Sequence, residues 1–295
     1  MNSLSLHQVT TKDGIPLEGL LFEPVKKTLT VAVWFQGLSG RLSSAPQRTN
    51  ELARILNGRG IALAAFDARG AGLITSFRKG KGKKKKWIIA GTSMEKFEHC
   101  VLDIRAVVGF LRKKGYRKIF LVGHSTGANK IAFYYGKTHD RAVNGLALLG
   151  PLSDFLGWKT SLKKNYRRAL GTAREMMKKG KGNALLPFLL ANGSYWSAAR
   201  FWSNARAGSN EDAFPYYDPK KKLNWAARLK IPVLVLIGGK DQYADRPISD
   251  IIDFFQARIP KEYFSGGVIK NADHGFAGKE DEMAKVVAKW IAKHR

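Results

Sequence analysis

The sequence lacks three features that would assign it to a special class of protein. It has a single cysteine, Cys100, so no intrachain disulfide framework is available. No apolar run approaches the ~18 residues that suggest a membrane-spanning helix. Residues 1–4 do not form the charged and then apolar segments of a secretory signal. These absences predict a cytoplasmic protein with no membrane span, and its hydrophobic content of 44% is ordinary for a globular chain.

Acidic residues are also scarce. The chain has 23 Asp and Glu against 51 Lys and Arg, which gives a net charge of +28 at pH 7. Such an excess attracts nucleic acid, anionic membranes or acidic ligands without specificity, and it favours solubility. Part of it is concentrated in the run from Lys79 to Lys86, which we predict to be a solvated loop. Apart from Trp87, nothing beside that run suggests base stacking, so no specific nucleic-acid partner is expected.

Apolar runs predict the strands of a mostly parallel sheet. Their continuous apolarity, without alternation, is what a sheet covered on both faces requires. The segment 4–23 differs because two alternating stretches flank Asp13-Gly14, which predicts an antiparallel hairpin at the sheet edge. The runs predicted to be buried strands are 29–36, 61–66, 118–122, 143–149 and 231–237, and a last strand is expected at 262–270.

Helical patterns lie between these strands, at 46–58, 95–114 and 282–292. Alternating strands and helices predict an α/β fold with a doubly wound, mostly parallel sheet. The alternation stops between 153 and 221, where helical composition is broken by several Gly and Pro residues. We therefore expect a core made of residues 1–152 and 222–295, with 153–221 inserted as a helical cap, or lid.

The motif Gly123-His124-Ser125-Thr126-Gly127 carries the clearest chemical signal. It directly follows the strand 118–122 and precedes a helical stretch, 128–135, which is the strand–turn–helix context of a G-x-S-x-G nucleophile elbow. Such a tight turn strains the serine backbone, so residues two positions away must lack side chains. The serine then lies at a helix N-terminus, where free N–H groups favour negative charge. We predict that Ser125 is a nucleophile.

A serine hydroxyl needs a base to take its proton, and the chain has six histidines. Of these, only His274 lies in a loop after the last predicted strand. It also satisfies the chain order Ser, acid, His that accompanies this kind of elbow. His274 is therefore the predicted general base, whereas His124 lies inside the elbow and should point away from the serine.

Three aspartates compete for the role of the acid that orients the histidine. Asp241 stands just beyond the strand 231–237, where a carboxylate can orient the imidazole and stabilise its charged form. Asp154 is the main rival because it follows the strand 143–149, and Asp245 lies four residues beyond Asp241. The prediction favours Asp241.

An oxyanion hole needs two backbone N–H groups aimed at the developing negative charge. One is expected from Thr126, the residue after the nucleophile. The other is expected from the loop that follows the strand 29–36, where Leu38 is the predicted donor.

These motifs together resemble the α/β-hydrolase superfamily. The segment Asp67-Ala68-Arg69-Gly70-Ala71-Gly72 adds to the likeness, because many members carry an Asp-x-Arg-Gly-x-Gly loop at this place. The resemblance covers residues 5–152 and 222–295 and implies an ester, thioester or amide hydrolase with a helical lid. Gln36 is a departure, since it stands where a histidine is common, and this puts the support of the oxyanion loop in question. The other residues that carry the likeness are Ser125, Asp241, His274 and Gly37.

The leading functional prediction is a serine esterase that cleaves a small-molecule carboxylic ester through an acyl-enzyme. A thioesterase or amidase using the same triad stays open, as does a non-catalytic protein that binds nucleic acid or an anionic surface on a hydrolase scaffold. No metal and no cofactor are predicted. His99 and Cys100 are adjacent on a helix and point apart, and Gly70-Ala71-Gly72 lacks the third glycine of a dinucleotide-binding fingerprint.

Positive charge is expected near the entrance of the site. The segment 153–221 carries 13 Lys and Arg against 5 Asp and Glu. This segment and the run Lys79–Lys86 should both emerge at the carboxyl edge of the sheet, where ligands of open α/β sheets bind. Two basic elements beside one entrance would attract an anionic ester substrate. The alternative is a lysine-rich loop that is only solvated.

Overall fold

The computed structural model describes residues 3–80, 85–190 and 193–295, and a sheet of eight strands runs through them in the order β1-β2-β4-β3-β7-β8-β9-β10. β1 pairs antiparallel with β2, and β2 pairs antiparallel with β4. The remaining neighbours in this sheet are parallel. The predicted edge hairpin and mostly parallel sheet are therefore confirmed. The strands are β1 Ser3–Thr10, β2 Pro16–Glu23, β3 Thr30–Phe35, β4 Ala62–Phe66, β7 Lys118–His124, β8 Val143–Leu149, β9 Val233–Gly238 and β10 Phe264–Ile269.

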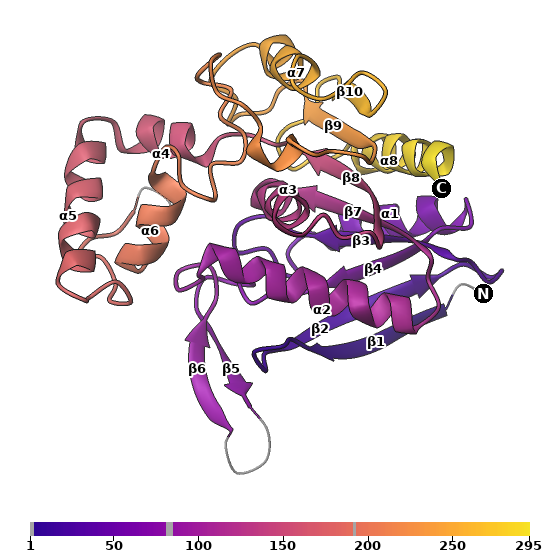
Figure 1. Ribbon diagram of the computed structural model, residues 1–295, viewed down its shortest axis with the longest axis horizontal. Coiled ribbons are helices and arrows are strands. Elements are labelled where there is room, and N and C mark those ends of the chain that lie inside the picture. Colours follow the sequence, from indigo (N-terminus) through magenta and orange to yellow (C-terminus); the bar gives the residue numbers. More distant parts are fainter. Residues whose placement is uncertain (1–2, 81–84, 191–192) are drawn as a thin grey trace.

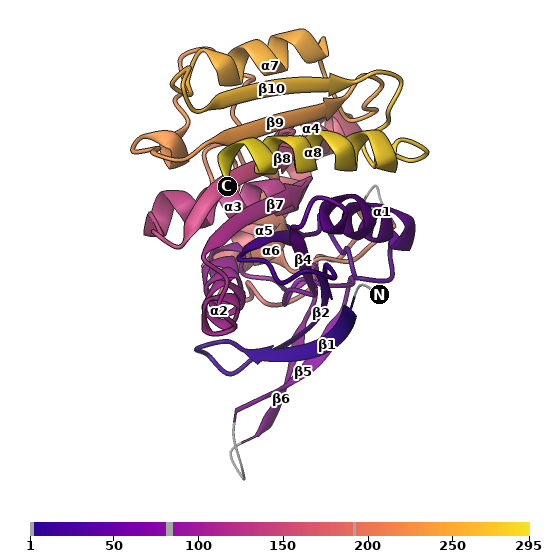
Figure 2. The same ribbon diagram turned by 90° about the vertical axis from the view of Figure 1, so that its right-hand side faces the viewer.

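Helices cover both faces of this sheet (Figures 1 and 2). α1 and α8 pack together on one face, whereas α2, α3 and α7 lie on the other. The predicted helices 46–58, 95–114 and 282–292 correspond to α1, α2 and α8, and α2 is preceded by a short 3₁₀ turn, η2 Phe97–His99. The bounds are α1 Pro46–Asn57, α2 Cys100–Lys113, α3 Thr126–Thr138, α7 Ile248–Gln256 and α8 Glu280–His294.

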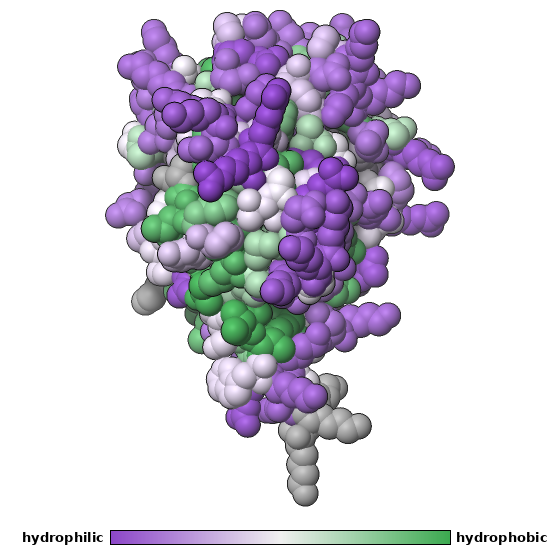
Figure 3. All heavy atoms as spheres, turned by 90° about the vertical axis from the view of Figure 1, so that its left-hand side faces the viewer, coloured by the Kyte–Doolittle hydropathy of each residue, from purple (hydrophilic) through white to green (hydrophobic). Residues whose placement is uncertain are grey.

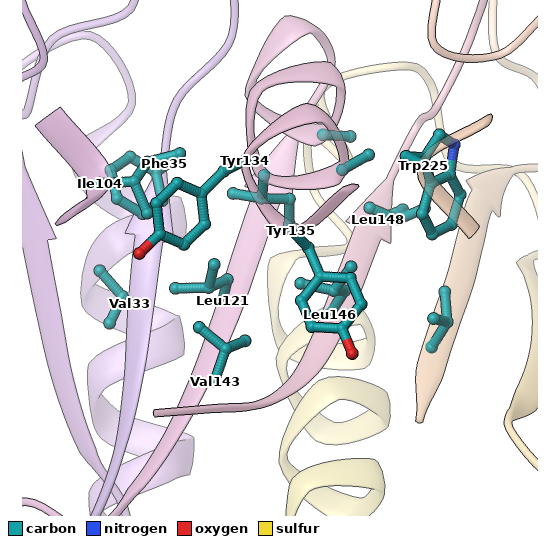
Figure 4. Close-up of a cluster of buried hydrophobic side chains, with 14 of the residues drawn as sticks. Val33, Phe35, Ile104, Leu121, Tyr134, Tyr135, Val143, Leu146, Leu148 and Trp225 are labelled. Atoms are coloured by element: carbon teal, nitrogen blue, oxygen red, sulfur yellow. The ribbon is translucent and has the colours of Figure 1, made fainter. Parts of the chain in front are cut away.

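β3 explains why the strand sequences are continuously apolar. Val31, Val33 and Phe35 enter one core, and Ala32 and Trp34 enter the core on the opposite face. Because successive side chains of a strand alternate between faces, both sets must be apolar when helices cover both sides. Figure 4 shows the first of these cores, where side chains from α3 lie over those of the strands. The doubly wound architecture follows from this two-sided burial.

The segment between β8 and β9 departs from the strand–helix alternation. It contains α4 Asp154–Leu162, the 3₁₀ turn η3 Lys163–Asn165, α5 Tyr166–Lys178 and α6 Ala198–Ala205, followed by the turn η4 Asn224–Ala226. Figure 1 shows α4, α5 and α6 beside the sheet and not on either face. They share a separate apolar cluster around Trp158, Trp196 and Phe201. Their helical character agrees with the sequence, whereas the division into core and cap stays a prediction.

A second, two-stranded sheet was not predicted. β5 Thr75–Lys79 pairs antiparallel with β6 Lys86–Ala90, and the hairpin projects away from the main sheet in Figure 1. Lys79 and Lys86 are thus paired strand residues, which corrects the prediction of a loop from 79 to 86. Residues 81–84 of that run lie outside the described residues. Phe77 and Ile88 pack against the core from one face of the hairpin, an alternation that the surrounding lysines obscure in the sequence.

Candidate active site

Ser125 lies between the end of β7 and the first residue of α3, in a strained turn. Its φ is 54°, in the left-handed region that residues other than glycine rarely adopt. A Cβ at Gly123 would lie 2.4 Å from the carbonyl oxygen of Gly127, and one at Gly127 would lie 2.3 Å from that of Phe35. Only glycine can therefore occupy these two positions. The backbone N–H of Ser125 donates to Leu149 O in the neighbouring β8 at 2.8 Å, which fixes the turn at the carboxyl edge of the sheet.

His274 and Asp241 meet at the same edge from two loops. His274 Nδ1 lies 2.7 Å from Asp241 Oδ2, and the Asp241 side chain is fully buried. The other carboxylate oxygen, Oδ1, accepts the backbone N–H of Tyr243 at 3.0 Å. Both oxygens of Asp241 thus have partners, and this carboxylate can orient the imidazole with Nε2 facing away from it.

The backbone of His274 is held at both of its polar groups by side chains that the sequence did not indicate. Gln242 Oε1 accepts its N–H at 3.0 Å, and His124 Nε2–H donates to its carbonyl oxygen at 2.7 Å. Burial lowers the pKa of His124 well below its usual value, so the ring is neutral. Arg48 Nη1 donates to the next carbonyl, that of Gly275, at 3.0 Å. These contacts fix the loop that carries the imidazole.

Gly150, at the end of β8, has to be a glycine because of the imidazole. Its φ is +57°, and a Cβ there would lie 3.0 Å from His274 Cε1 and 3.2 Å from Nδ1. A side chain at this position would displace the ring from its contact with Asp241.

The loop after β3 lies directly against the serine. A Cβ at Gly37 would come within 2.8 Å of Ser125 Cβ, so the missing side chain allows this close approach. Within the described residues, the backbone N–H of Leu38 has no acceptor. Thr126 is the first residue of α3, where N–H groups have no intrahelical partner. Both predicted oxyanion donors therefore belong to backbone that borders Ser125.

The oxyanion loop is supported from the Asp67–Gly72 motif and not by Gln36, whose buried Nε2 has no hydrogen-bond partner. Ser39 N–H donates to Thr92 Oγ1 at 2.7 Å, and Gly72 N–H donates to Ser39 O at 3.1 Å. The oxyanion loop is therefore supported even though Gln36 stands where a histidine is common. Arg69 anchors the motif through a buried ion pair to Asp103 at 2.7 Å and a partly buried one to Asp13 at 3.0 Å.

A cavity of about 740 Å³ lies over these groups. Ser125, His274 and Leu38 line it, whereas Asp241 lies behind the imidazole and Thr126 lies at the helix start, so neither is part of its wall. The rest of the wall comes mainly from the 36–48 region, residues 153–161 and residues 242–245, and it also includes Gly150, Leu152 and Asn204. The arrangement places a strained serine, an oriented imidazole and the Leu38 backbone at one cavity, with Thr126 next to the serine in the chain.

The two rival aspartates also line the cavity, but neither contacts the histidine ring. Asp245 is paired with Arg246 at 2.9 Å. Asp154 begins α4, and its Oδ2 is buried without a hydrogen-bond partner. Burial, followed by repulsion from Glu211, raises the pKa of Asp154 to about 7. The carboxyl group of Asp154 is thus partly neutral at neutral pH.

The raised pKa of Asp154 predicts a pH-dependent effect on stability. The unfolded chain releases this proton near pH 4 and the folded chain near pH 7, so the wild type loses stability as the pH rises through that window. Asp154→Asn is expected to stabilise the fold by about 2–4 kcal/mol at pH 8, at 1.36 kcal/mol per pKa unit, and to have little effect at pH 4. Urea unfolding of both proteins at the two pH values measures this. An equal difference at both would contradict it.

The positive charge does not surround the cavity in the predicted way. None of the described residues of the run Lys79–Lys86 lines the cavity, which is bounded partly by the 153–221 segment. Figure 3, viewed from the side of α4, α5 and α6, shows mostly hydrophilic side chains around a smaller hydrophobic area. The charges on α5 at Arg167, Arg168 and Arg174 are exposed to solvent. The described structure therefore supports a solvated basic surface more than a charged entrance.

Two features are absent from the part of the chain that the structure describes. None of its helices is long and apolar enough to cross a membrane. No group of three or more His, Cys, Asp or Glu side chains there could hold a metal ion.

Solved structures share this architecture over nearly the whole chain. Est1E from Butyrivibrio proteoclasticus, in a structure with ferulic acid bound, has a TM-score of 0.66 and 15% identity, covering 98% of this chain and 99% of that one. An esterase domain from Rhodothermus marinus has a TM-score of 0.60 and 16% identity, covering 99% of each chain. An esterase of Pyrococcus furiosus gives 0.59 and 17%, covering 99% and 92%. The fold is thus the α/β-hydrolase fold, as the sequence predicted.

The sequence also matches a protein family, over residues 91–294. The chain belongs to this family, which is described as "Protein of unknown function (DUF1749)". No curated protein matches the chain.

Proposed function

We propose that this protein is a serine hydrolase that cleaves a carboxylic ester through an acyl-enzyme, with Ser125 as nucleophile, His274 as general base and Asp241 as the orienting acid. The contact between His274 Nδ1 and Asp241 Oδ2, beside a cavity that also receives the strained Ser125, carries the proposal. The esterase-like structural neighbours support the reaction class.

The chemistry follows from the roles of the three side chains. Ser125 Oγ attacks the ester carbonyl while His274 Nε2 takes its proton, and the backbone N–H groups of Leu38 and Thr126 hold the developing oxyanion. The tetrahedral intermediate expels the alcohol, which receives the proton from His274. Water, deprotonated by the same imidazole, then attacks the acyl-enzyme and releases the carboxylic acid. Asp241 stabilises the imidazolium that forms in both halves of the reaction.

The substrate binds in the cavity beside Ser125. We assign the 153–221 segment the role of a cap over this cavity. The helix α4 provides part of the cavity wall. A volume of about 740 Å³ is within the range of small-molecule sites, roughly 300–1,000 Å³. Est1E, one of the similar structures, binds ferulic acid, and we propose small esters, aromatic ones included, as substrates here.

Covalent labelling tests this function. A fluorophosphonate reacts only with an activated serine, so we expect it to modify Ser125 stoichiometrically, as read by intact mass and peptide mapping. His274→Ala should lose labelling because Oγ keeps its proton. Ser161→Ala, which changes another serine of the cavity wall, is the matched control and should be labelled normally. Absence of labelling in the wild type would favour a non-catalytic binding protein.

A further inference from the structure

One part of the cavity wall has polar groups that the protein does not satisfy. Asp154 Oδ2 is shut off from solvent without a hydrogen-bond partner, Asn204 Nδ2 is likewise buried, and both residues line the cavity. The Asn204 amide faces the carboxyl group of Asp154, and a hydrogen bond from it lowers the pKa that burial raises. Buried polar atoms without partners are costly, and at the wall of a binding cavity a ligand can supply the missing partner.

Trp158 fixes the orientation of the Asn204 amide. The indole Nε1–H of Trp158 donates to Asn204 Oδ1. Since the amide oxygen is used in this way, the NH₂ group of Asn204 is the end left to donate near Asp154. This end of the cavity therefore has a donor whose direction is set by the aromatic cluster of α4 and α6.

The charges around Asp154 are already balanced among themselves. Arg200 of α6 pairs with Glu211, and Lys130 of α3 pairs with Glu95 at 2.7 Å. All four side chains are almost completely buried, and Arg200 also lies 3.8 Å from Glu95. Arg200 is the cation of this network that favours an ionised Asp154, and its charge is shared with Glu211 and Glu95.

The remaining acid near Asp154 adds repulsion. Asp212 accepts the hydroxyl of Tyr217, lies 3.8 Å from Lys221 Nζ, and raises the pKa of Asp154 together with Glu211. The neutral carboxyl form of Asp154 is thus favoured, and in that form it has an O–H to donate.

We propose that Asp154, held by the amide of Asn204, forms a substrate-recognition site whose carboxyl O–H donates a hydrogen bond to a neutral acceptor oxygen, a carbonyl or ether oxygen, carried by the ester away from its scissile bond. This inference rests on the proposed esterase function and specifies its substrate class. An anionic group at this place would meet Glu211 and Asp212, and an ammonium group would require Asp154 to ionise against the cost of its burial. A neutral oxygen satisfies the carboxyl O–H with no added charge.

Paired esters test the proposal. One series consists of 4-nitrophenyl alkanoates in which a ketone replaces one methylene at successive positions, each compared with the unsubstituted ester. The second consists of acetate esters of the corresponding keto-alcohols, so that both sides of the scissile bond are examined. At about pH 5.5 we expect kcat/KM to favour at least one keto position by about tenfold, the effect of satisfying one buried donor. At about pH 8.5 the preference should be lost, because a carboxylate repels the ketone oxygen.

Two variants separate hydrogen bonding from charge. Asp154→Asn should keep the preference for the keto ester at both pH values. The amide oxygen of the variant accepts from Asn204, and its N–H donates to the ligand oxygen. Asp154→Leu should abolish the preference at both. Asp250→Asn changes an exposed carboxyl that is not part of the cavity wall, and it should behave as the wild type does.

The outcomes distinguish this inference from the proposed function. Fluorophosphonate labelling of Ser125 and turnover of the unsubstituted alkanoates test the function and the folding of each variant. If those remain intact but no keto position is preferred in either series, the recognition site is refuted. A wild-type preference that persists at high pH, or a stronger preference for an ammonium-bearing ester, would also refute it.

Discussion

Ser125→Ala is expected to reduce ester turnover by about 10⁴-fold or more while the protein stays folded. The change removes one oxygen and no core volume, and alanine occupies the same strained backbone no worse than serine does. The oxyanion donors and the cavity remain, so a small residual rate above that in water should persist. Turnover of a 4-nitrophenyl ester together with far-UV circular dichroism measures both parts of the expectation.

The matched control for this change is Ser161→Ala, which should retain wild-type turnover. If Ser125→Ala itself keeps near wild-type turnover, the nucleophile is a different residue and the elbow has only a structural role.

Asp241→Asn is expected to lower kcat by roughly 10³–10⁴-fold. The geometry gives the reason. Asp241 Oδ1 accepts the Tyr243 N–H, so the amide oxygen of the variant should keep that bond and turn its NH₂ group towards His274. His274 Nδ1 must then be an acceptor, so the ring proton lies on Nε2. A protonated Nε2 cannot accept the proton of Ser125. The pH dependence of kcat, and the fluorophosphonate labelling rate, measure the loss.

Asp154→Asn provides the comparison that decides between the two candidate acids. On an unsubstituted ester it should lower kcat far less than Asp241→Asn does, because Asp154 makes no contact with the imidazole. The reverse ranking would assign the acid to the end of β8 and would refute Asp241.

The core strands and the elbow could be predicted because their causes are local. β3 and β7 are apolar at successive positions, and two-sided burial requires this whatever the rest of the chain does. Gly123 and Gly127 flank the serine at the spacing that the tight turn needs. By contrast, β5 and β6 were not predicted. Only Phe77 and Ile88 pack against the core from these strands, and lysines surround them in the sequence.

The second layer of the site could not be predicted, since its contacts join distant parts of the chain. Gln242 and His124 hold the two polar groups of the His274 backbone, 32 and 150 residues apart from it respectively. Arg48 reaches the same loop from α1. A glutamine, a buried histidine and an arginine have no spacing or periodicity that would indicate such roles.

The sequence by itself determined the α/β class and the turn that holds Ser125, because apolar periodicity and glycine spacing act over a few residues. It also made His274 the candidate base, through its place after the last strand. Only the tertiary structure decided which aspartate meets the imidazole. Asp241 and Asp154 both follow a strand at the same edge of the sheet, so the sequence favoured Asp241 but left Asp154 open. The folded chain gives Asp241 a partner for each oxygen and leaves Asp154 in a buried, charge-balanced corner of the cavity, since the pKa and the contacts of a carboxyl group depend on neighbours brought together by folding.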